Sequence, residues 1–347
     1  MKTIFYRAQT QYENYGDLLI NRNLIRMMRK HGKLVIDVNG VPDFFLKGLE
    51  LREDEVSNNK LYLLRMVKEA VINYKKVYFF TKPGHVEYHN KPFGAMKLSI
   101  NTIVYFFMWT LGIKICRFGG SIGKSDKFSS FFENMKGKFY HAYVVRDTGS
   151  LNIARCAGYK NLHLASDLAF NNQYTKSKSI SEKTVVISFR ESGYADKISD
   201  LYQNLINNEF DVSGLIQVDR DLGFMKSMFS TSELSVYLSE TGKTEDMISK
   251  SYLNNKFVIS NRLHVLLVGM SFGAIPIAFV DSSNSKIIDL FNDIGLSDCI
   301  FDAGNDSDMC AYLVKIKKLN IDFKKFYDTQ NELNDNIFDN MIFRDSK

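Results

Sequence analysis

Short apolar runs alternate with helical patterns along most of this chain. In the first half, the runs that predict strands are residues 3–6, 34–38, 76–80, 113–118, 142–145 and 162–165. Between the first two runs, apolar residues recur at the spacing of one helix face. Such an alternation of strands and helices indicates βαβ units and parallel sheets.

The second half repeats this pattern after a polar segment, residues 171–183, which is poor in aliphatic residues and is the best linker candidate. Its predicted strands are residues 184–189, 215–218, 235–238, 256–260 and 275–280, and the chain beyond Asp306 has a helical pattern. We therefore expect an α/β fold of two Rossmann-like domains facing each other across a cleft. The expected boundaries are residues 1–175 and 183–320, followed by a helical tail at 321–347.

Glycines and charged residues gather directly after the predicted strands. They form the segments ENYGD (13–17), GGSIG (119–123), RDTGS (146–150), SD (166–167), FRES (189–192), VDRD (218–221), SNRLH (260–264) and DSSNSK (281–286). Ligands of open parallel sheets bind beyond the carboxyl ends of the strands. The pattern therefore predicts a polar cleft between two packed domains.

One stretch, Ile103 to Ile113, is apolar over about 11 residues. It is too short to span the roughly 30 Å of hydrocarbon in a bilayer. We expect it to form a buried helix, and an interfacial membrane helix is the alternative.

Composition narrows the function only in part. The 347 residues carry a net charge of +6, which suits an anionic substrate or a negatively charged membrane surface. Nucleic-acid binding has little support, because 45 basic residues are offset by 39 acidic ones and no recognition motif is present. The first residues form a strand pattern without the apolar core of a signal peptide, so we expect a cytoplasmic protein. The four cysteines have no close pairing, which favours a reducing compartment over a disulfide framework or a zinc site.

The segment that begins at Phe257 predicts a strand followed by a helix that opens at Arg262. Free N–H groups make the first turn of a helix electropositive, and Arg262 and His264 add two potential cations there. Arginine offers a planar fork for carboxylate or phosphate, and histidine titrates near neutral pH. We interpret this helix start as an anion-binding site, with ordinary helix-start packing as the alternative.

In the first half, Asp17 follows Gly16 at a predicted helix start, where Asn14 and Gly16 would shape the loop. Asp17 could orient or deprotonate a substrate hydroxyl, or it could be an ordinary acidic residue at a helix N-terminus. For Arg146 and Asp147 we favour a structural role, in which Asp147 caps the helix that follows it. No histidine has a partner at a spacing that suggests a metal site.

Several segments, taken in order over about 300 residues, resemble the polysaccharide pyruvyltransferase family. They are NYGDLLINRNLI, GGSIG, VVRDTGSLNIARCAG followed by SDLAF, VVISFR, and ISNRLHVLLVGMSFGAIPIAFV with a downstream lysine. The resemblance implies two domains arranged as in the GT-B glycosyltransferases. It also implies transfer of the enolpyruvyl unit of phosphoenolpyruvate to a sugar as a ketal, during the synthesis of cell-surface polysaccharides.

The resemblance also implies roles for single residues. Arg262 and His264, with Leu263 between them, would contact phosphoenolpyruvate, and Arg190 matches another substrate arginine of the family. Lys286 stands where a further cation could meet phosphate. Ketal formation needs an acid at the vinyl carbon and a base at the sugar hydroxyls, roles that suit His264 and Asp17, whereas it requires neither a metal nor a cofactor.

On the acceptor side, we expect the substrate-binding residues Asn14, Gly16 and Gly120 of the first domain, together with Asp17, to face Arg190, Arg262, His264 and Lys286 of the second domain across the cleft. The saccharide acceptor could be lipid-linked, and we expect at most peripheral attachment to the inner face of the membrane. The segment FRES departs from the Arg-Pro continuation that is more usual in the family.

Two other functions stay open. A glycosyltransferase with a nucleotide-sugar donor would use the same scaffold, and Glu191, Glu240 or Glu245 could contact its ribose. A non-catalytic partner in polysaccharide assembly is the second alternative, although the presence of Arg190, Arg262 and His264 together argues against it.

Overall fold

The computed structural model describes residues 2–58, 61–73, 76–86, 92–123, 127–171, 175, 181–192, 195–229, 234–236, 244–281, 285–305, 308–318 and 321–344. The chain divides into two compact units. Unit 1 comprises Met1–Tyr12, Asp17–Leu168 and Gln330–Lys347, and unit 2 comprises Glu13–Gly16 and Ala169–Thr329. Of the predicted linker, residues 172–174 and 176–180 lie outside the described residues.

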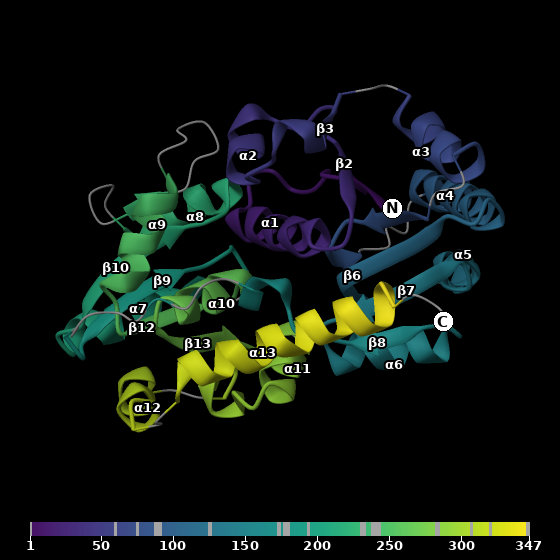
Figure 1. The fold of residues 1–347 in the computed structure, drawn as a ribbon. Helices are drawn as coiled ribbons and strands as arrows, with labels where there is room; N and C mark the ends of the chain where they lie inside the picture. The colour runs from purple at the N-terminus through teal and green to yellow at the C-terminus, as the bar shows by residue number, and fades with distance from the viewer. Residues whose placement is uncertain are drawn as a thin grey trace. The chain divides into compact units, whose positions relative to one another are not determined.

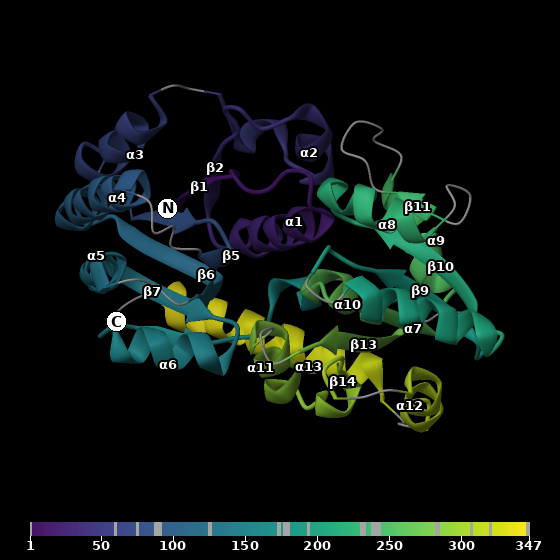
Figure 2. The same cartoon turned by 180° about the vertical axis from the view of Figure 1, so that it is seen from behind.

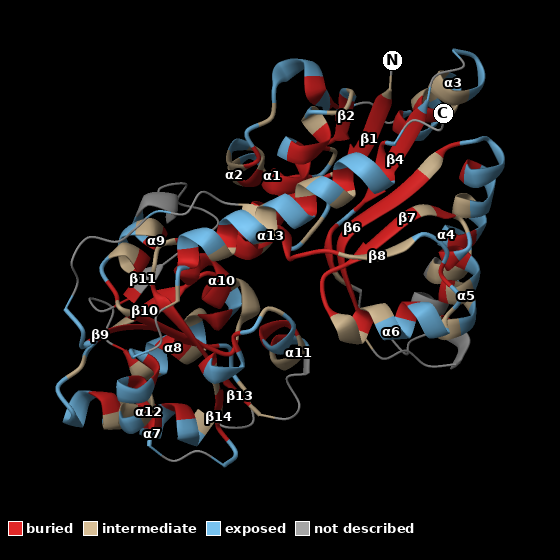
Figure 3. Ribbon diagram, turned by 60° about the horizontal axis from the view of Figure 1, so that its bottom comes forward, coloured by how far each residue is buried: buried red, intermediate tan, exposed pale blue. Residues whose placement is uncertain are grey.

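Unit 1 contains, within the described residues, an eight-stranded parallel sheet of order β3-β2-β1-β4-β6-β7-β8, with β5 paired to β6. Its strands are β1 (Thr3–Arg7), β2 (Lys33–Asp37), β3 (Val56–Ser57), β4 (Val77–Thr81), β5 (Gly84–Val86), β6 (Lys114–Ile122), β7 (Tyr140–Val145) and β8 (Leu162–Leu164). Strands β1, β4 and β6 are buried almost throughout (Figure 3). Strands covered on both faces read as largely apolar runs, and such runs at residues 3–6, 76–80 and 113–118 made these three strands predictable.

The helices of unit 1 connect these strands (Figure 1). They are α1 (Tyr15–Arg29), α2 (Asp43–Gly48), α3 (Tyr62–Val71), α4 (Pro92–Thr110), α5 (Lys127–Gly137) and α6 (Thr148–Cys156). Helix α13 (Phe323–Ile337) begins in unit 2 and ends in unit 1, where a π-helical turn, Phe338–Ile342, follows it. The rings of Phe338 and Phe343 lie 5.5 and 5.9 Å from that of Phe80, so the C-terminal segment completes the core of unit 1.

Unit 2 contains a six-stranded parallel sheet of order β11-β10-β9-β12-β13-β14 in its described residues. Its strands are β9 (Thr184–Ser188), β10 (Asp211–Ile216), β11 (Leu234–Val236), β12 (Phe257–Ser260), β13 (Ile275–Val280) and β14 (Ile300–Asp302). Its helices are α7 (Ala195–Asn207), α8 (Leu222–Met228), α9 (Thr244–Leu253), α10 (Leu263–Ser271), α11 (Ser285–Asp293) and α12 (Met309–Ile316). The strand order reverses between β9 and β12, and this switch point is where doubly wound sheets bind their ligands.

The prediction of an α/β protein with two parallel sheets is confirmed. The predicted strand at residues 215–218 was displaced, because β10 starts at Asp211 with a polar sequence that includes Ser213 and Gly214. Strands β3, β5 and β14 were not predicted, since each has only two or three residues.

The expectation of a buried helix at Ile103 to Ile113 was wrong. Residues 103–110 belong to α4, and residues 111–113 connect this helix to β6. Only part of the helix surface packs inward. Met108 is buried, whereas Ile103, Phe107 and Trp109 are 56%, 59% and 53% exposed. Apolar residues all around a helix are typical of burial, and that pattern was misleading here. None of the described helices combines the length and apolar character needed to cross a bilayer.

Candidate active site

The carboxyl ends of β9 and β12, the central pair of strands in unit 2, are joined by side-chain hydrogen bonds. Asn261 accepts a bond from the backbone N–H of Arg190 at 3.0 Å and donates one to its carbonyl oxygen at 3.1 Å. The hydroxyl of Ser260 donates to the Ser188 carbonyl and accepts from the backbone N–H of Arg262 at 2.9 Å. These bonds fix the backbone from which Arg190 and Arg262 project.

Arg262 forms a two-point ion pair with Asp221, which lies in the short helical turn Asp219–Asp221 after β10. Its Nη2 donates to Oδ1 and its Nε lies against Oδ2. The two side chains are only 13% and 4% exposed, so the pair is largely withdrawn from water. This ion pair occupies one edge of the guanidinium, and the Nη1 end carries further donors.

Arg190 and Arg220 lie close enough to Arg262 to act on it electrostatically. Burial lowers the pKa of Arg262, Asp221 opposes that shift, and the charges of Arg220 and Arg190 lower the pKa further. Burial also raises the pKa of Asp221, although all three arginines favour its charged form. Arg190, Arg220 and Arg262, whose charges all act on Asp221, form a cationic cluster that a bound anion would stabilise.

Helix α10 begins at this cluster, with Arg262 as its N-cap residue, Leu263 first and His264 second. The first backbone N–H groups of a helix have no acceptor within it and make its start electropositive. Two buried tyrosines hold the first turns of the helix in place. Tyr252 donates a hydrogen bond to the carbonyl of Val265 (3.1 Å), and Tyr327 donates one to the carbonyl of Leu267 (2.5 Å). The expected opening at Arg262 is therefore one residue early, and the helix start still lies beside Arg262 and His264.

The backbone of Gly16 packs against His264. A Cβ atom at position 16 would lie 2.4 Å from both Cβ and Nδ1 of His264, so an L side chain does not fit. Asn14 forms a β-bridge with Val218, and its Oδ1 accepts from the N–H of Gly16 at 3.0 Å. Asn14 and Gly16, which we expected in the first domain, thus pack within unit 2.

Leu263 and Lys286 occupy neighbouring positions on the same sheet edge. Leu263 is half-buried at the start of α10. Lys286 is exposed in the first turn of α11, which follows β13, the strand next to β12.

Asp17 and Gly120 both belong to unit 1. Asp17 accepts hydrogen bonds from the Thr10 hydroxyl at 2.6 Å and from the Gln11 N–H at 3.3 Å, in the first turn of α1. Gly120 lies inside β6 and is buried, so the expectation that GGSIG follows a strand was wrong. A Cβ at Gly120 would come within 3.0 Å of Nε of Arg117, so this glycine makes room for the arginine side chain.

The structural interpretation of Arg146 and Asp147 is confirmed. Asp147 caps α6 by accepting from the N–H of Ser150 at 2.6 Å, and Arg146 forms a buried ion pair with Asp167 at 2.5 Å. Among the described residues, no group of three or more His, Cys, Asp or Glu side chains could hold a metal ion.

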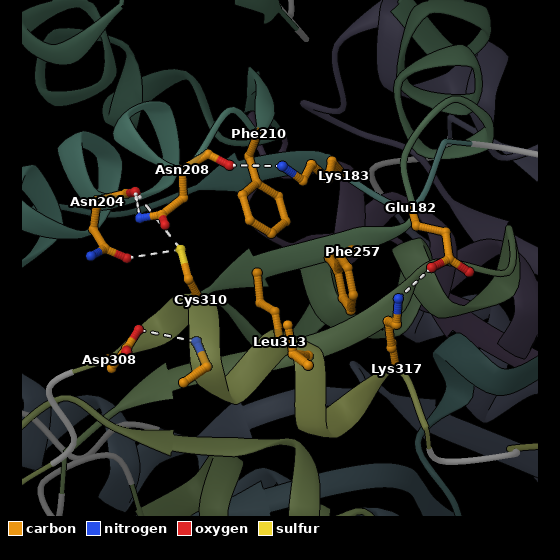
Figure 4. Close-up of a pocket in the computed structure, with 12 residues that line it drawn as sticks. Glu182, Lys183, Asn204, Asn208, Phe210, Phe257, Asp308, Cys310, Leu313 and Lys317 are labelled. Atoms are coloured by element: carbon orange, nitrogen blue, oxygen red, sulfur yellow. Dashed lines mark hydrogen bonds and ion pairs between the residues drawn. The ribbon is translucent and has the colours of Figure 1, made fainter.

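A pocket of about 570 Å³ lies at the opposite, amino edge of the unit 2 sheet (Figure 4). Lys183 precedes β9 and Phe257 begins β12, and the pocket is closed by α7 and α12. Its rim carries the ion pairs Lys183–Glu209 and Lys317–Glu182. It shares no residue with the arginine cluster and lies at the edge where parallel sheets do not usually bind ligands.

Sequence reasoning missed Asp221 and Arg220 as parts of this site. Both stand in the segment VDRD, which was noted only as a charged strand end. Asp221 follows β10 and Arg262 follows β12, and β9 lies between these two strands in the sheet. The contact between the two side chains therefore depends on the strand order, which the sequence pattern does not show.

In a comparison with protein families, a model of the polysaccharide pyruvyl transferase family matches residues 14–283. This range contains every residue of the cluster described above. The curated proteins gave no match.

Comparison with solved structures shows the fold. MnaA of S. aureus in complex with UDP has a TM-score of 0.55 and 11% identity, covering 100% of this chain and 99% of that chain. UDP-GlcNAc 2-epimerase from Methanocaldococcus jannaschii has a TM-score of 0.56 and 10% identity, covering 97% and 98%. The lipopolysaccharide outer core galactosyltransferase WaaB has a TM-score of 0.50 and 12% identity, covering 99% of both chains. The expected GT-B-like fold class is confirmed, and identities this low establish the fold alone.

Proposed function

Because this chain belongs to the polysaccharide pyruvyl transferase family, we propose that it transfers the enolpyruvyl unit of phosphoenolpyruvate to a saccharide as a ketal, in the synthesis of cell-surface polysaccharides. The observation that carries the proposal is the cluster of Arg190, Arg220 and Arg262 beside the start of α10. Phosphoenolpyruvate carries a carboxylate and a phosphate, and both are ligands for arginine forks and helix N-termini.

The cluster suits a ligand with two anionic groups. Asp221 holds one edge of Arg262 and so fixes the direction of its remaining donors. Arg190 follows β9 and Arg262 follows β12, so the two arginines approach the switch point from different strands. We propose that one binds the carboxylate and the other the phosphate of the donor, with Lys286 as a further cation near the phosphate.

The reaction then divides into two additions. In the first, His264 gives a proton to the vinyl CH₂ carbon, and a sugar hydroxyl attacks the resulting cationic carbon and loses its own proton to a base. In the second, the C–O bond to phosphate breaks, another hydroxyl of the same sugar attacks the same carbon, and the proton of that hydroxyl passes to the departing phosphate. The products are the ketal and inorganic phosphate. The packing of Gly16 against His264 supports this role, because it limits where the imidazole can lie.

Asp17 is our proposal for the base or for the group that orients the acceptor. Its hydrogen bonds with Thr10 and Gln11 hold the carboxylate in one orientation at the start of α1. The saccharide acceptor, its lipid linkage and the cytoplasmic location of the enzyme stay predictions.

A nucleotide-sugar glycosyltransferase is the second candidate, because the similar solved structures include a galactosyltransferase and a protein bound to UDP. That likeness concerns the scaffold. The family match and the cluster of arginines favour phosphoenolpyruvate instead.

A thermal-shift assay with the full chain tests the proposal. A ligand at 100 times its dissociation constant stabilises the folded state by about 2.7 kcal/mol. We expect phosphoenolpyruvate to raise the melting temperature more than pyruvate or inorganic phosphate, because each of these fills only part of the site. Stabilisation by UDP or a UDP-sugar, with none by phosphoenolpyruvate, would overturn the proposal in favour of the glycosyltransferase.

A further inference from the structure

Exposed apolar side chains are concentrated in one part of unit 1. Fourteen of the 21 large apolar side chains that are exposed among the described residues lie between Leu61 and Met135. They belong to α3, α4 and α5 or to their immediate flanks, namely Leu61, Leu63, Leu64, Val71, Ile72, Met96, Ile100, Ile103, Phe106, Phe107, Trp109, Leu111, Phe131 and Met135. Figure 1 and Figure 2 show these three helices side by side along one face of the unit 1 sheet. Exposed apolar patches of this extent mark interaction sites.

The apolar face of α4, which we define as Ile103, Phe106, Phe107 and Trp109, is continuous with the end of α5. The rings of Phe106 and Trp109 lie 5.7 and 5.8 Å from that of Phe139, which follows α5. Phe106 also contacts Phe107 and Trp109, at 5.7 and 6.4 Å between ring centroids. The helix is anchored on its other side by buried Met108 and Thr102. The face is therefore a fixed part of a folded helix.

The same region carries the positive charge of the chain. Residues 61–140 contain 13 Lys and Arg against 4 Asp and Glu, whereas the rest of the chain contains 32 against 35. Arg117 and Lys136 are buried, but Lys68, Lys76 and Lys138 are exposed. The net charge of +6 thus arises from the segment that also presents the apolar face.

We propose that the apolar face of α4, with its basic surroundings, docks on the surface of an anionic lipid bilayer. Phenylalanine and tryptophan on one side of a helix, with lysine and arginine around it, are typical of helices that lie in the membrane interface. Each basic residue near an anionic bilayer adds to the attraction. A symmetric contact between two copies would instead bring two positively charged surfaces together. The inference does not depend on the proposed chemistry.

Trp109 provides the direct test, because it is the only tryptophan of the chain and is 53% exposed on the proposed surface. The full-length protein is mixed with vesicles of phosphatidylcholine, with or without phosphatidylglycerol. We expect co-sedimentation with the anionic vesicles, a shift of Trp109 emission to shorter wavelength and quenching by brominated lipid. Vesicles of phosphatidylcholine alone should give much weaker signals, and high salt should weaken binding to the anionic vesicles.

Variants locate the surface. Ile103→Glu and Phe107→Glu should each weaken partitioning to anionic vesicles by roughly tenfold or more, since each removes an apolar side chain from the contact. Val314→Glu is the matched control, because Val314 is 52% exposed on α12 in unit 2, and it should bind normally. Circular dichroism confirms that each variant is folded. Equal weakening by all three variants would contradict the proposal.

The charges require their own pair of variants. Lys68→Glu together with Lys138→Glu should weaken binding, whereas Lys324→Glu, on α13, should not. Absence of vesicle binding by the unaltered protein overturns the proposal. It is also overturned if Trp109 emission shifts with protein concentration alone and ultracentrifugation shows a dimer, because a second copy would then cover this face.

Discussion

Replacing Gly16 with alanine tests whether His264 is held where the chemistry needs it. The added Cβ would lie 2.4 Å from Cβ of His264, whereas carbon atoms pack at about 3.5–4.0 Å. Because that Cβ is attached directly to the backbone of α10, rotation of the imidazole cannot relieve the contact. The two backbones must therefore separate by roughly 1 Å or more.

We expect Gly16→Ala to cost about 1–3 kcal/mol of stability through overpacking. The melting temperature should fall by about 2–4 °C for each kcal/mol in a unit of this size. Because Arg262 lies at the start of the same helix, this displacement should also weaken its contact with the donor, and phosphoenolpyruvate affinity should fall by about tenfold to a hundredfold, the value of one charge-assisted hydrogen bond. Calorimetric titration and thermal unfolding measure both effects.

Gly223→Ala is the matched control for this variant. A Cβ at position 223, in α8, meets no atom within 4 Å, so that change should leave affinity unaltered and stability equal or slightly higher. The packing of Gly16 on His264 is refuted if the two variants give the same affinity and the same melting temperature.

Four further predictions concern the site and the stability of the chain. Arg262→Lys keeps the charge but loses the fork held by Asp221, so calorimetry should show about tenfold to a hundredfold weaker phosphoenolpyruvate binding; unchanged affinity would exclude Arg262 as a contact. His264→Gln should leave that affinity near normal and lower phosphate release with a saccharide acceptor by roughly 10²–10⁴-fold; normal turnover would place the acid elsewhere, with Asp17 the next residue to test. Burial lowers the pKa of His31 and of His141, so each binds a proton less readily in the folded protein than in the unfolded chain. The unfolded chain then binds more protons, so the free energy of unfolding, measured with denaturant, should fall as pH decreases through about 6.5. The variant His141→Phe should show a smaller fall. A free energy of unfolding that does not change with pH in this range would contradict the prediction. Activity should survive a chelator, whereas loss of activity and its recovery with Mg²⁺ or Mn²⁺ would favour a nucleotide-sugar donor.

The central strands of unit 2 were predictable because they are apolar over most of their length. β12 and β13 are buried at every position, and their sequences give the same pattern. β3 and β14 lie at sheet edges and are too short to show any period. α4 was recognised as apolar, but the sequence did not reveal that much of its surface has no cover within unit 1.

The candidate site was predictable only as separate strand ends. Arg190 and Arg262 stood out because charged residues follow apolar strands, and the sheet brings their strands side by side. The pairing of Asp221 with Arg262 requires β9 to lie between β10 and β12, an order that no local pattern encodes. The contact of Gly16 with His264 likewise depends on how an N-terminal segment packs in unit 2, which the sequence does not reveal.

Hydrogen exchange of the full chain with and without phosphoenolpyruvate tests the central claim most directly. If the donor binds at the arginine cluster, exchange should slow in peptides that cover Asp219–Asp221 and the start of α10, because both segments line the site. Peptides around Asn208 and Cys310, which line the pocket at the amino edge of the sheet, should exchange at the same rate in both samples. Slower exchange around Asn208 and Cys310, with no change at Asp221 and His264, would contradict the account.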